Sequence, residues 1–395
     1  MSVRRVIAVF GLLALLLAGC DGPATPGGAG ATTAAAPALR PAWQPLTLPA
    51  PPGPAGRALL RDAAACAGRW FLVGGLADSA GGTRPAAWTS MDGTTWTVLP
   101  VRPESFYGKQ NVFLSAACRD GRVAVIGAKV GGAHGYPRVS TWRQVADGAL
   151  VEVQAPFETY GGPTAVNVSR LTAGAPGWLI VGNRSAGAAS WVASPAAAEF
   201  TLIEGAPELA SDRVGVTWAF DAVATSSGWL AVGGLLPAGR IDRDPAVWSS
   251  PDGRSWRRTV LPGGSEYEEL QRVVLVGGVP VAVGLRGATF GAWRQEGAGW
   301  VAAGTFGRRS GAGVPVVVAL VSSGDRLFAA VADGSRHSVW VSTDRGESWR
   351  EVAMPADVPA GVDRDVALVA VGDRCWLAAD DGTRAGLWSA TGIGV

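Results

Sequence analysis

Arginines recur along this chain in loop-like segments, and a guanidinium is the side chain best suited to hold a carboxylate through two parallel hydrogen bonds. One such arginine falls in each of seven repeats described below: Arg84, Arg138, Arg184, Arg243, Arg286, Arg336 and Arg384. If these loops share one rim, the arginines predict a binding site for acidic ligands. The alternative interpretation is that they are ordinary solvated charges, because Lys109 and Lys129 are the only lysines and nearly every cation is therefore arginine.

Three of the four tyrosines lie in segments that lead into a new repeat: Tyr107, Tyr160 and Tyr267. We expect Tyr107 and Tyr160 to be ligand-binding residues on the same face as the arginines, because binding residues usually lie on loops. Tyr267 is followed directly by Glu268 and Glu269. These three consecutive residues are the candidates for a catalytic role.

Several kinds of chemistry are not expected. His134 and His337 are the only histidines, and no Cys/His cluster has metal-ligand spacing, so we expect neither a metal nor a cofactor. The formal net charge is +2, and two arginines of the N-terminal leader account for it. The rest of the chain is neutral, which argues against a nucleic-acid partner.

The elements that position these residues are short strands. Residues 246–262 read as two strands joined by an Asp-Gly turn, which is a strong hairpin signal. Similar segments recur at a mean spacing of about 50 residues, which is typical of a four-stranded propeller blade. Each is marked by one tryptophan: Trp88, Trp142, Trp191, Trp248, Trp293, Trp340 and Trp388. We predict an all-β fold, a seven-bladed β-propeller of four-stranded antiparallel blades over residues 42–395.

The seventh unit ends at Val395, shortly after Trp388, without a fourth strand of its own. Residues 43–49, Trp-Gln-Pro-Leu-Thr-Leu-Pro, match the pattern of the fourth strands, which often end in an apolar residue and proline. We therefore predict that the N-terminal segment supplies the outer strand of the last blade. Such a closure pairs the two ends of the chain and removes the weak seam of the ring.

Three turns between third and fourth strands resemble the Asp-box of bacterial neuraminidase (BNR) repeats. The segment 342–349 contains Asp344, and two copies shorter by one residue contain Asp92 and Asp252. The resemblance implies a sialidase-like propeller in which the aspartate accepts backbone N–H groups, the glycine is left-handed and a tryptophan packs against the neighbouring hairpin. The box is a structural device that also occurs in sugar-binding proteins and photosystem assembly factors, so it indicates fold more than activity.

A sialidase needs a tyrosine nucleophile assisted by a glutamate, an aspartic acid, and three arginines that hold the substrate carboxylate. By this resemblance Tyr267 with Glu268 or Glu269, together with rim arginines, supplies the residue types. The family's Arg-Ile-Pro signature is absent near the first strand, and the family's catalytic propeller has six blades rather than seven. A sialidase-like exo-glycosidase is therefore the alternative and not the main hypothesis.

Residues 1–19 predict a lipoprotein signal peptide, because two arginines precede an apolar run that ends in Leu-Ala-Gly-Cys. This tetrapeptide resembles a bacterial lipobox, which implies cleavage before Cys20 and lipid on that cysteine. An ordinary signal peptide or a membrane anchor is the alternative. Residues 20–41 are rich in Gly, Ala, Pro and Thr and predict a flexible tether. We expect a protein anchored to the cell membrane on its extracytoplasmic side.

Cys66 and Cys118 end the first strands of adjacent units, so an oxidising compartment permits a disulfide between them that leaves Cys375 free and buried. A Cys66–Cys375 bond and three unpaired thiols are the alternatives. The first strands would line the central channel, and several of them carry charges: Asp62, Arg170, Asp221, Arg272 and Asp365. We expect these charges to pair across blades.

Three functions follow as hypotheses. The first is a monomeric binding or scaffold module that presents its loop face to an envelope protein or glycan. The second is the sialidase-like hydrolase, and the third is an assembly factor for a membrane complex. A rigid ring on a flexible tether favours the first and third, because reach and a broad rim suit binding and no acid–base constellation is evident.

Overall fold

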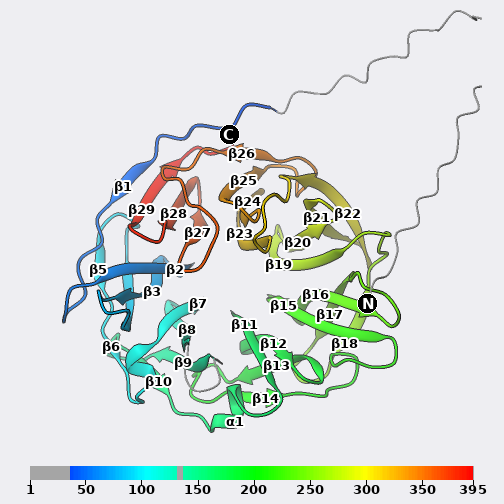
Figure 1. Cartoon of the computed structure of the whole chain (residues 1–395), viewed down its shortest axis with the longest axis horizontal. Helices are drawn as coiled ribbons and strands as arrows, with labels where there is room; N and C mark the ends of the chain where they lie inside the picture. The colour runs from blue at the N-terminus through cyan, green and yellow to red at the C-terminus, as the bar shows by residue number, and fades with distance from the viewer. Residues whose placement is uncertain (1–35, 131–136, 395) are drawn as a thin grey trace, which may run out of the picture. The chain divides into compact units, whose positions relative to one another are not determined.

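Each repeat of the sequence forms one sheet, and seven sheets follow one another around a ring (Figure 1). The structure is a computed structural model that describes residues 36–130 and 137–394. The predicted signal peptide, Cys20 and most of the predicted tether lie outside these residues. Within each sheet the first strand lies nearest the centre of the ring and the fourth lies at its periphery (Figure 1). The prediction of a seven-bladed β-propeller is confirmed.

The blades are numbered here in chain order. The first three contain β2 (Arg57–Cys66), β3 (Arg69–Ala77), β4 (Thr83–Ser90) and β5 (Trp96–Val98); β7 (Val112–Arg119), β8 (Arg122–Lys129), β9 (Arg138–Gln144) and β10 (Leu150–Val153); and β11 (Ala165–Gly174), β12 (Gly177–Arg184), β13 (Gly187–Ala193) and β14 (Thr201–Ile203). Blade 2 gains a fifth strand, because β6 (Val101–Arg102) pairs in parallel with β10.

The next three blades contain β15 (Gly215–Thr225), β16 (Gly228–Pro237), β17 (Asp244–Ser250) and β18 (Arg257–Val260); β19 (Glu268–Val276), β20 (Val279–Arg286), β21 (Thr289–Glu296) and β22 (Gly299–Phe306); and β23 (Val316–Ser323), β24 (Arg326–Ala332), β25 (His337–Ser342) and β26 (Arg350–Val352). Blade 7 contains β27 (Asp365–Val371), β28 (Arg374–Asp380), β29 (Ala385–Thr391) and β1 (Gln44–Leu46). Among the described residues the helices are limited to η1 (Gly108–Gln110) and α1 (Phe157–Tyr160).

The N-terminal segment runs along the outside of the last two blades. Strand β1 pairs antiparallel with β29, with Gln44 opposite Ser389 and Leu46 opposite Leu387. This is the pairing predicted for residues 43–49. Contacts with the propeller begin before the predicted boundary at residue 42, because the backbone N–H of Leu39 donates to the carbonyl oxygen of Glu351 beside β26 at 2.8 Å.

The hydrophobic core is divided among the interfaces between neighbouring blades. The described residues form seven apolar clusters, and each combines side chains from two adjacent blades. Trp248 of blade 4, for example, packs in one cluster with Leu179 of blade 3. Because flat indoles fill the space between facing sheets, the tryptophan repeat of the sequence is explained mainly by packing.

A β-bulge interrupts the first strand of blades 1 to 6. In blades 1, 4 and 5 the bulge brings this strand so close to the second strand that a side chain does not fit there. An ideal Cβ on Gly74 would lie 1.7 Å from the carbonyl oxygen of Leu59, and one on Gly233 would lie 1.9 Å from that of Trp218. The Val-Gly pair of these second strands therefore reflects a backbone contact.

The bulges also account for the polar side chains near the channel. A bulge disturbs the ladder locally, so nearby N–H groups need other acceptors. Asp62 of blade 1 accepts the N–H of Ala116 in blade 2 at 2.8 Å. Further acceptors repeat this pattern from one blade to the next: Ser115 for Leu171, Asn183 for Ala219, Asp221 for Val273 and Gln271 for Val317. Four of these five bonds connect adjacent first strands around the ring, and the acceptor of the fifth, Asn183, lies in the second strand of blade 3.

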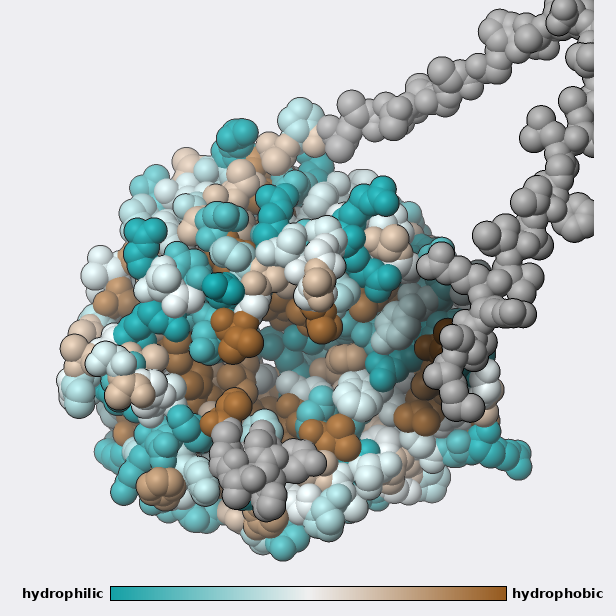
Figure 2. All heavy atoms as spheres, in the orientation of Figure 1, coloured by the Kyte–Doolittle hydropathy of each residue, from teal (hydrophilic) through white to brown (hydrophobic). Residues whose placement is uncertain are grey.

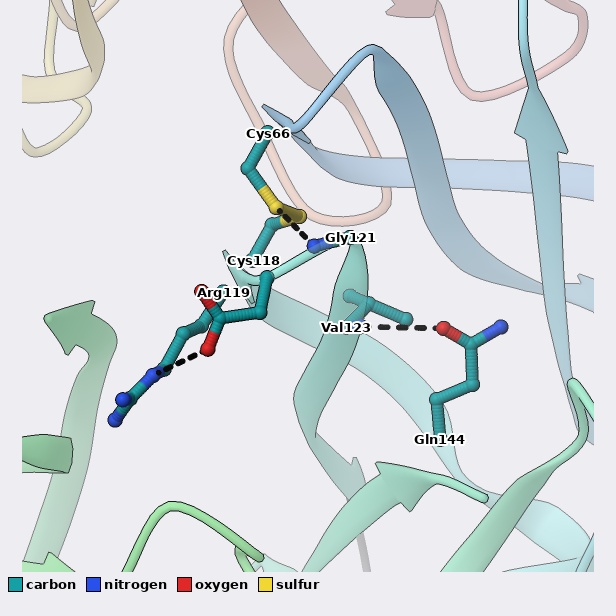
Figure 3. The surroundings of a disulfide bond; sticks show 7 residues. Cys66, Cys118, Arg119, Gly121, Val123 and Gln144 are labelled. Carbon is teal, nitrogen blue, oxygen red and sulfur yellow. Dashed lines mark hydrogen bonds and ion pairs between the residues drawn. A yellow bond between two sulfur atoms is a disulfide. The ribbon is translucent and has the colours of Figure 1, made fainter. Parts of the chain in front are cut away.

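A disulfide joins the first strands of blades 1 and 2 (Figure 3). It links Cys66 at the end of β2 to Cys118 in β7, with a Cα–Cα distance of 5.7 Å. This distance lies within the usual range for disulfides. The backbone N–H of Gly121 points at the sulfur of Cys66 (Figure 3). The predicted Cys66–Cys118 pairing is confirmed, and among the described residues Cys375 is the free, buried cysteine.

Candidate functional site

The seven predicted rim arginines do not converge on one site. Five of them already have acceptors. Arg84 donates to the carbonyl oxygens of Pro52 and Pro54. The other four form ion pairs: Arg184 with Glu204, Arg243 with Glu269, Arg286 with Glu268, and Arg336 with Glu351. Arg384 is exposed in the β28–β29 turn. The remaining member, Arg138, is the one that lines the same cavity as both predicted tyrosines.

Arg138 begins β9, and its guanidinium lies between two aromatic rings. The Cζ atom is 4.9 Å from the centre of the Phe157 ring and 5.5 Å from the centre of the Tyr107 ring. Tyr107 precedes η1 and Phe157 begins α1, so the two short helices bring the rings to this position. Within residues 36–130 and 137–394, no acceptor forms a hydrogen bond or ion pair with this guanidinium. Its N–H edge therefore has no partner among the described residues.

An apolar cavity of about 460 Å³ lies beside Arg138, between blades 2 and 3. Its walls include Leu114 and Ile126 from blade 2 and Val166 and Val168 from blade 3. A smaller cavity of about 190 Å³ shares Arg138 and Phe157 and extends toward Tyr107. We call the two together the Arg138 pocket. An apolar cavity with one charged group at its edge is a common form of ligand site.

Tyr160 closes one side of the Arg138 pocket. Its ring is 9% exposed, and its hydroxyl is 3.1 Å from the Thr141 hydroxyl. Burial raises the pKa of Tyr160 well above its ordinary value, although the hydrogen bond to Thr141 opposes this. The residue is therefore a neutral wall of the pocket.

Glu152 lies at the base of the smaller cavity and is held as a carboxylate. Burial opposes its ionisation, but hydrogen bonds from Ser105, from the backbone of Glu104 and from Ser140 outweigh that effect and lower its pKa. The Glu152 side chain thereby anchors the loop that carries Tyr107. Its negative charge also discourages an anion from entering deeper than Arg138.

Two of the three catalytic candidates, Tyr267 and Glu269, form a closed network with Arg243 and Gln271. The Tyr267 hydroxyl donates to Glu269 at 2.7 Å, and the Arg243 guanidinium donates to the same carboxylate oxygen at 2.7 Å. Gln271 donates to the other oxygen at 2.7 Å. Burial and the adjacent Glu269 charge raise the pKa of Tyr267 far above its ordinary value. The Tyr267 hydroxyl and the Glu269 carboxylate lie within the reach of a nucleophile and its base, but Arg243 already binds the same carboxylate oxygen.

Glu268 is separate from this network. It pairs with Arg286 at 3.1 Å, because adjacent residues of β19 point to opposite faces of the sheet. The three consecutive candidates thus divide between two sets of partners.

The predicted channel charges lie together and are paired in part. Arg170 of blade 3 donates to Asp62 of blade 1 at 3.0 Å, which confirms pairing across blades for these two residues. Burial lowers the pKa of Arg272 to about 10 and raises that of Asp365 to about 7. No described group of three or more His, Cys, Asp or Glu residues is arranged to hold a metal ion.

The three turns that contain Asp92, Asp252 and Asp344 are structural. Asp92 accepts the N–H groups of Thr94 and Thr95, each at 2.7 Å. Gly93 has a φ of +70°, and its carbonyl oxygen accepts the indole N–H of Trp376 from blade 7. An analogous set of bonds forms around Asp252 and Asp344. These aspartates hold turns against neighbouring blades.

Several residues of the Arg138 pocket were not expected from the sequence. Phe157 is 56% exposed and Leu114 is 42% exposed, although neither stood out as a candidate. The face seen in Figure 2 is hollow at its centre, and apolar side chains gather around the opening among polar ones. The sequence did hold a signal for Phe157. This phenylalanine follows a proline in a loop, and a loop offers no core in which an aromatic ring is buried.

The sheets and their strand pairing define the class of protein: an all-β, seven-bladed propeller. Comparison with protein-family models finds no match, and neither does a search of curated proteins. Among the described residues, no helix has the length and apolarity needed to cross a membrane.

Solved structures that are similar to the chain are also propellers or contain them. The β-propeller domain of the Trilobed protease from Pyrococcus furiosus is 8% identical, with 85% of this chain and 95% of that chain covered and a TM-score of 0.47. The Hadza microbial sialidase Hz136 is 12% identical, with 86% of this chain and 66% of that chain covered and a TM-score of 0.44. The Pyrococcus horikoshii acylaminoacyl peptidase is 10% identical, with 85% and 52% covered and a TM-score of 0.47. The chain thus spans about half of the peptidase, and similarity at this level says nothing about function.

Proposed function

We propose that this chain is a binding module, tethered to the cell membrane by lipid on Cys20, that presents its loop face to an envelope protein or glycan on the extracytoplasmic side. The observation that carries the proposal is the Arg138 guanidinium, which is held between two aromatic rings at the edge of an apolar cavity. Propellers commonly bind through such loop faces, because the sheets hold the loops rigidly.

The chemistry of the pocket favours an acidic ligand with an apolar neighbour. A guanidinium stacked on aromatic faces keeps its N–H edge free, and that edge matches a carboxylate in bidentate geometry. The adjoining cavity of about 460 Å³ has room for a large apolar side chain. A protein segment that places Asp or Glu beside a Leu, Phe or Trp combines both features.

The test is a matched set of short peptides that pair Asp or Glu with an apolar residue, alongside the same peptides carrying Asn or Gln. We expect the acidic peptides to bind the chain about tenfold tighter by fluorescence polarisation, since a charged hydrogen-bonded contact at an interface centre typically contributes this much or more. In the Arg138→Gln variant this preference should disappear.

Arg384→Gln is the matched control, because Arg384 occupies the equivalent turn of blade 7 and is exposed. The control should keep the preference for acidic peptides. Equal binding of acidic and amide peptides by the unmodified chain contradicts the proposal, as does an undiminished preference in Arg138→Gln.

The geometry gives less support to the sialidase-like hydrolase. Arg243 is already engaged with Glu269 and stacks on Trp218 at 5.2 Å, so it is not free to hold a substrate carboxylate. The assembly-factor hypothesis is a special case of protein binding and would use the same Arg138 pocket.

A further inference from the structure

Trp340 departs from the pattern of the marker tryptophans in blades 1, 3 and 4. In blades 1, 3 and 4 the indole N–H donates to a carbonyl oxygen of the segment that enters the blade: Pro49 for Trp88, Thr159 for Trp191 and Glu208 for Trp248. That segment covers the ring, and all three tryptophans are 1% exposed or less. The Trp340 N–H donates instead to Ser338 of its own strand at 3.0 Å, and the ring is only partly buried.

Trp340 differs because of the path of residues 307–315, the segment that enters blade 6. This segment is fastened to the β24–β25 turn and not to the indole: the Ser310 N–H donates to the Asp333 carbonyl oxygen at 2.7 Å, and the Gly313 N–H donates to that of Gly334 at 3.1 Å. This approach requires glycine, since a Cβ on Gly334 would lie 2.3 Å from the Ser310 carbonyl oxygen. Gly307 passes the ring without a side chain to cover it.

The result is a preformed cavity of about 330 Å³ with one aromatic wall and a polar rim. The indole of Trp340 forms this wall together with the buried Phe290. The rim carries hydroxyl, carboxylate and guanidinium groups from two loops: Arg308, Ser310, Asp333, Ser335 and Arg336. Asp333 is ionised there, because backbone N–H bonds from Arg336 and Ser335 outweigh the cost of burial and lower its pKa.

This combination matches one class of ligand well. A pyranose ring has apolar C–H faces that stack on an indole and hydroxyl edges that both donate and accept hydrogen bonds. An apolar peptide would leave the charged rim unpaired, and burying unpaired polar groups is costly. The cavity volume also suits a single sugar unit rather than a protein segment.

We propose that the cavity at Trp340 is a saccharide-binding site, in which the indole stacks on a pyranose while Ser335, Asp333 and Arg308 bond to its hydroxyl groups. The proposal deepens the proposed binding role, but it uses a pocket between blades 5 and 6 that is separate from the Arg138 pocket. The two sites can therefore be tested independently.

The test uses the full chain and four trisaccharide probes: maltotriose, chitotriose, mannotriose and sialyllactose. Saturation-transfer NMR identifies the sugars that bind, and calorimetry gives their affinities. We expect at least one probe to bind and Trp340→Ala to weaken it by about tenfold or more, as is usual when a central aromatic contact is removed. Trp340→Phe should retain most of the affinity, since it keeps an aromatic wall.

Two further variants separate this site from folding and from the other pocket. Ser335→Trp places a bulky ring at an exposed rim position and should block the cavity without lowering the melting temperature. Arg138→Gln should leave sugar binding unchanged even if peptide binding fails. Absence of saturation transfer from all four probes, or binding that survives both Trp340→Ala and Ser335→Trp, overturns the proposal.

Discussion

Asp365 begins β27, where it faces the charges of the central channel. Burial raises its pKa to about 7, and the nearby Arg61 and the N–H of Val366 only partly oppose this shift. The folded chain thus keeps a proton between about pH 4 and pH 7 that the unfolded chain releases. Because the unfolded state binds fewer protons there, the free energy of unfolding falls as the pH rises through this window.

Asp365→Asn removes this titration and should therefore stabilise the protein at high pH. We expect the melting temperature of the variant at pH 8 to exceed that of the unmodified chain by roughly 2–4 °C, and the two to agree near pH 4. Differential scanning calorimetry at both values measures the effect. Asp325→Asn, at an exposed turn, is the control and should leave the melting temperature unchanged at both pH values. A variant less stable at pH 8 would show that the Asp365 charge is favourable in the channel.

At the scale of residues, contacts between residues at equivalent positions of two repeats could be predicted from the sequence. Cys66 and Cys118 occupy equivalent strand ends, and Asp62 and Arg170 occupy equivalent bulges, so their proximity was predictable. The isolation of Arg138 was not predictable. Whether an arginine finds an acceptor depends on loop conformation, as when Arg84 bonds to the carbonyl oxygen of Pro52, 32 residues earlier.

At the scale of elements, the second-strand glycines of blades 1, 4 and 5 follow from the bulges opposite them. A Cβ at Gly233 would meet the Trp218 carbonyl oxygen at 1.9 Å, and backbone cannot yield as a flexible side chain can. Gly233→Ala should therefore lower the free energy of unfolding by about 2–3 kcal/mol, through overpacking of a buried strand pair. Urea denaturation followed by tryptophan fluorescence measures the change.

Gly264→Ala provides the matched comparison, since a Cβ there would meet nothing closer than 3.8 Å and the backbone needs no positive φ. The free energy of unfolding of this variant should stay within about 0.5 kcal/mol of that of the unmodified chain. Similar losses in the two variants would mean that glycine content alone, and not the bulge contact, sets the effect.

The elements themselves were largely predictable, because alternation, turns and a regular tryptophan spacing all indicate short antiparallel strands. The bulges were not, because a register shift depends on the partner strand and leaves no pattern within either strand alone. The Val232-Gly233 pair was visible in the sequence, but its cause required both strands.

At the scale of the whole molecule, the N-terminal segment fastens three blades. Leu39 bonds beside β26 of blade 6, and β1 pairs with β29 of blade 7. Leu46 and Leu48 then pack in the cluster between blades 7 and 1, and the Pro49 carbonyl oxygen accepts the Trp88 indole N–H at 2.8 Å. The fold could be predicted at this scale because the seventh repeat visibly lacked a strand and residues 43–49 matched it.

Two truncations distinguish this fastening from the rest of the N-terminus. A chain that begins at Pro37 keeps every one of these contacts, and it should melt at the same temperature as the full chain. A chain that begins at Pro51 loses β1 and exposes the edge of β29, so its melting temperature should fall by roughly 3–8 °C. It should also associate on heating, as measured by light scattering, because an unpaired strand edge can pair with another chain. If the two truncated chains have the same melting temperature, the seam between blades 7 and 1 is held by side-chain packing alone and β1 contributes no stability to the ring.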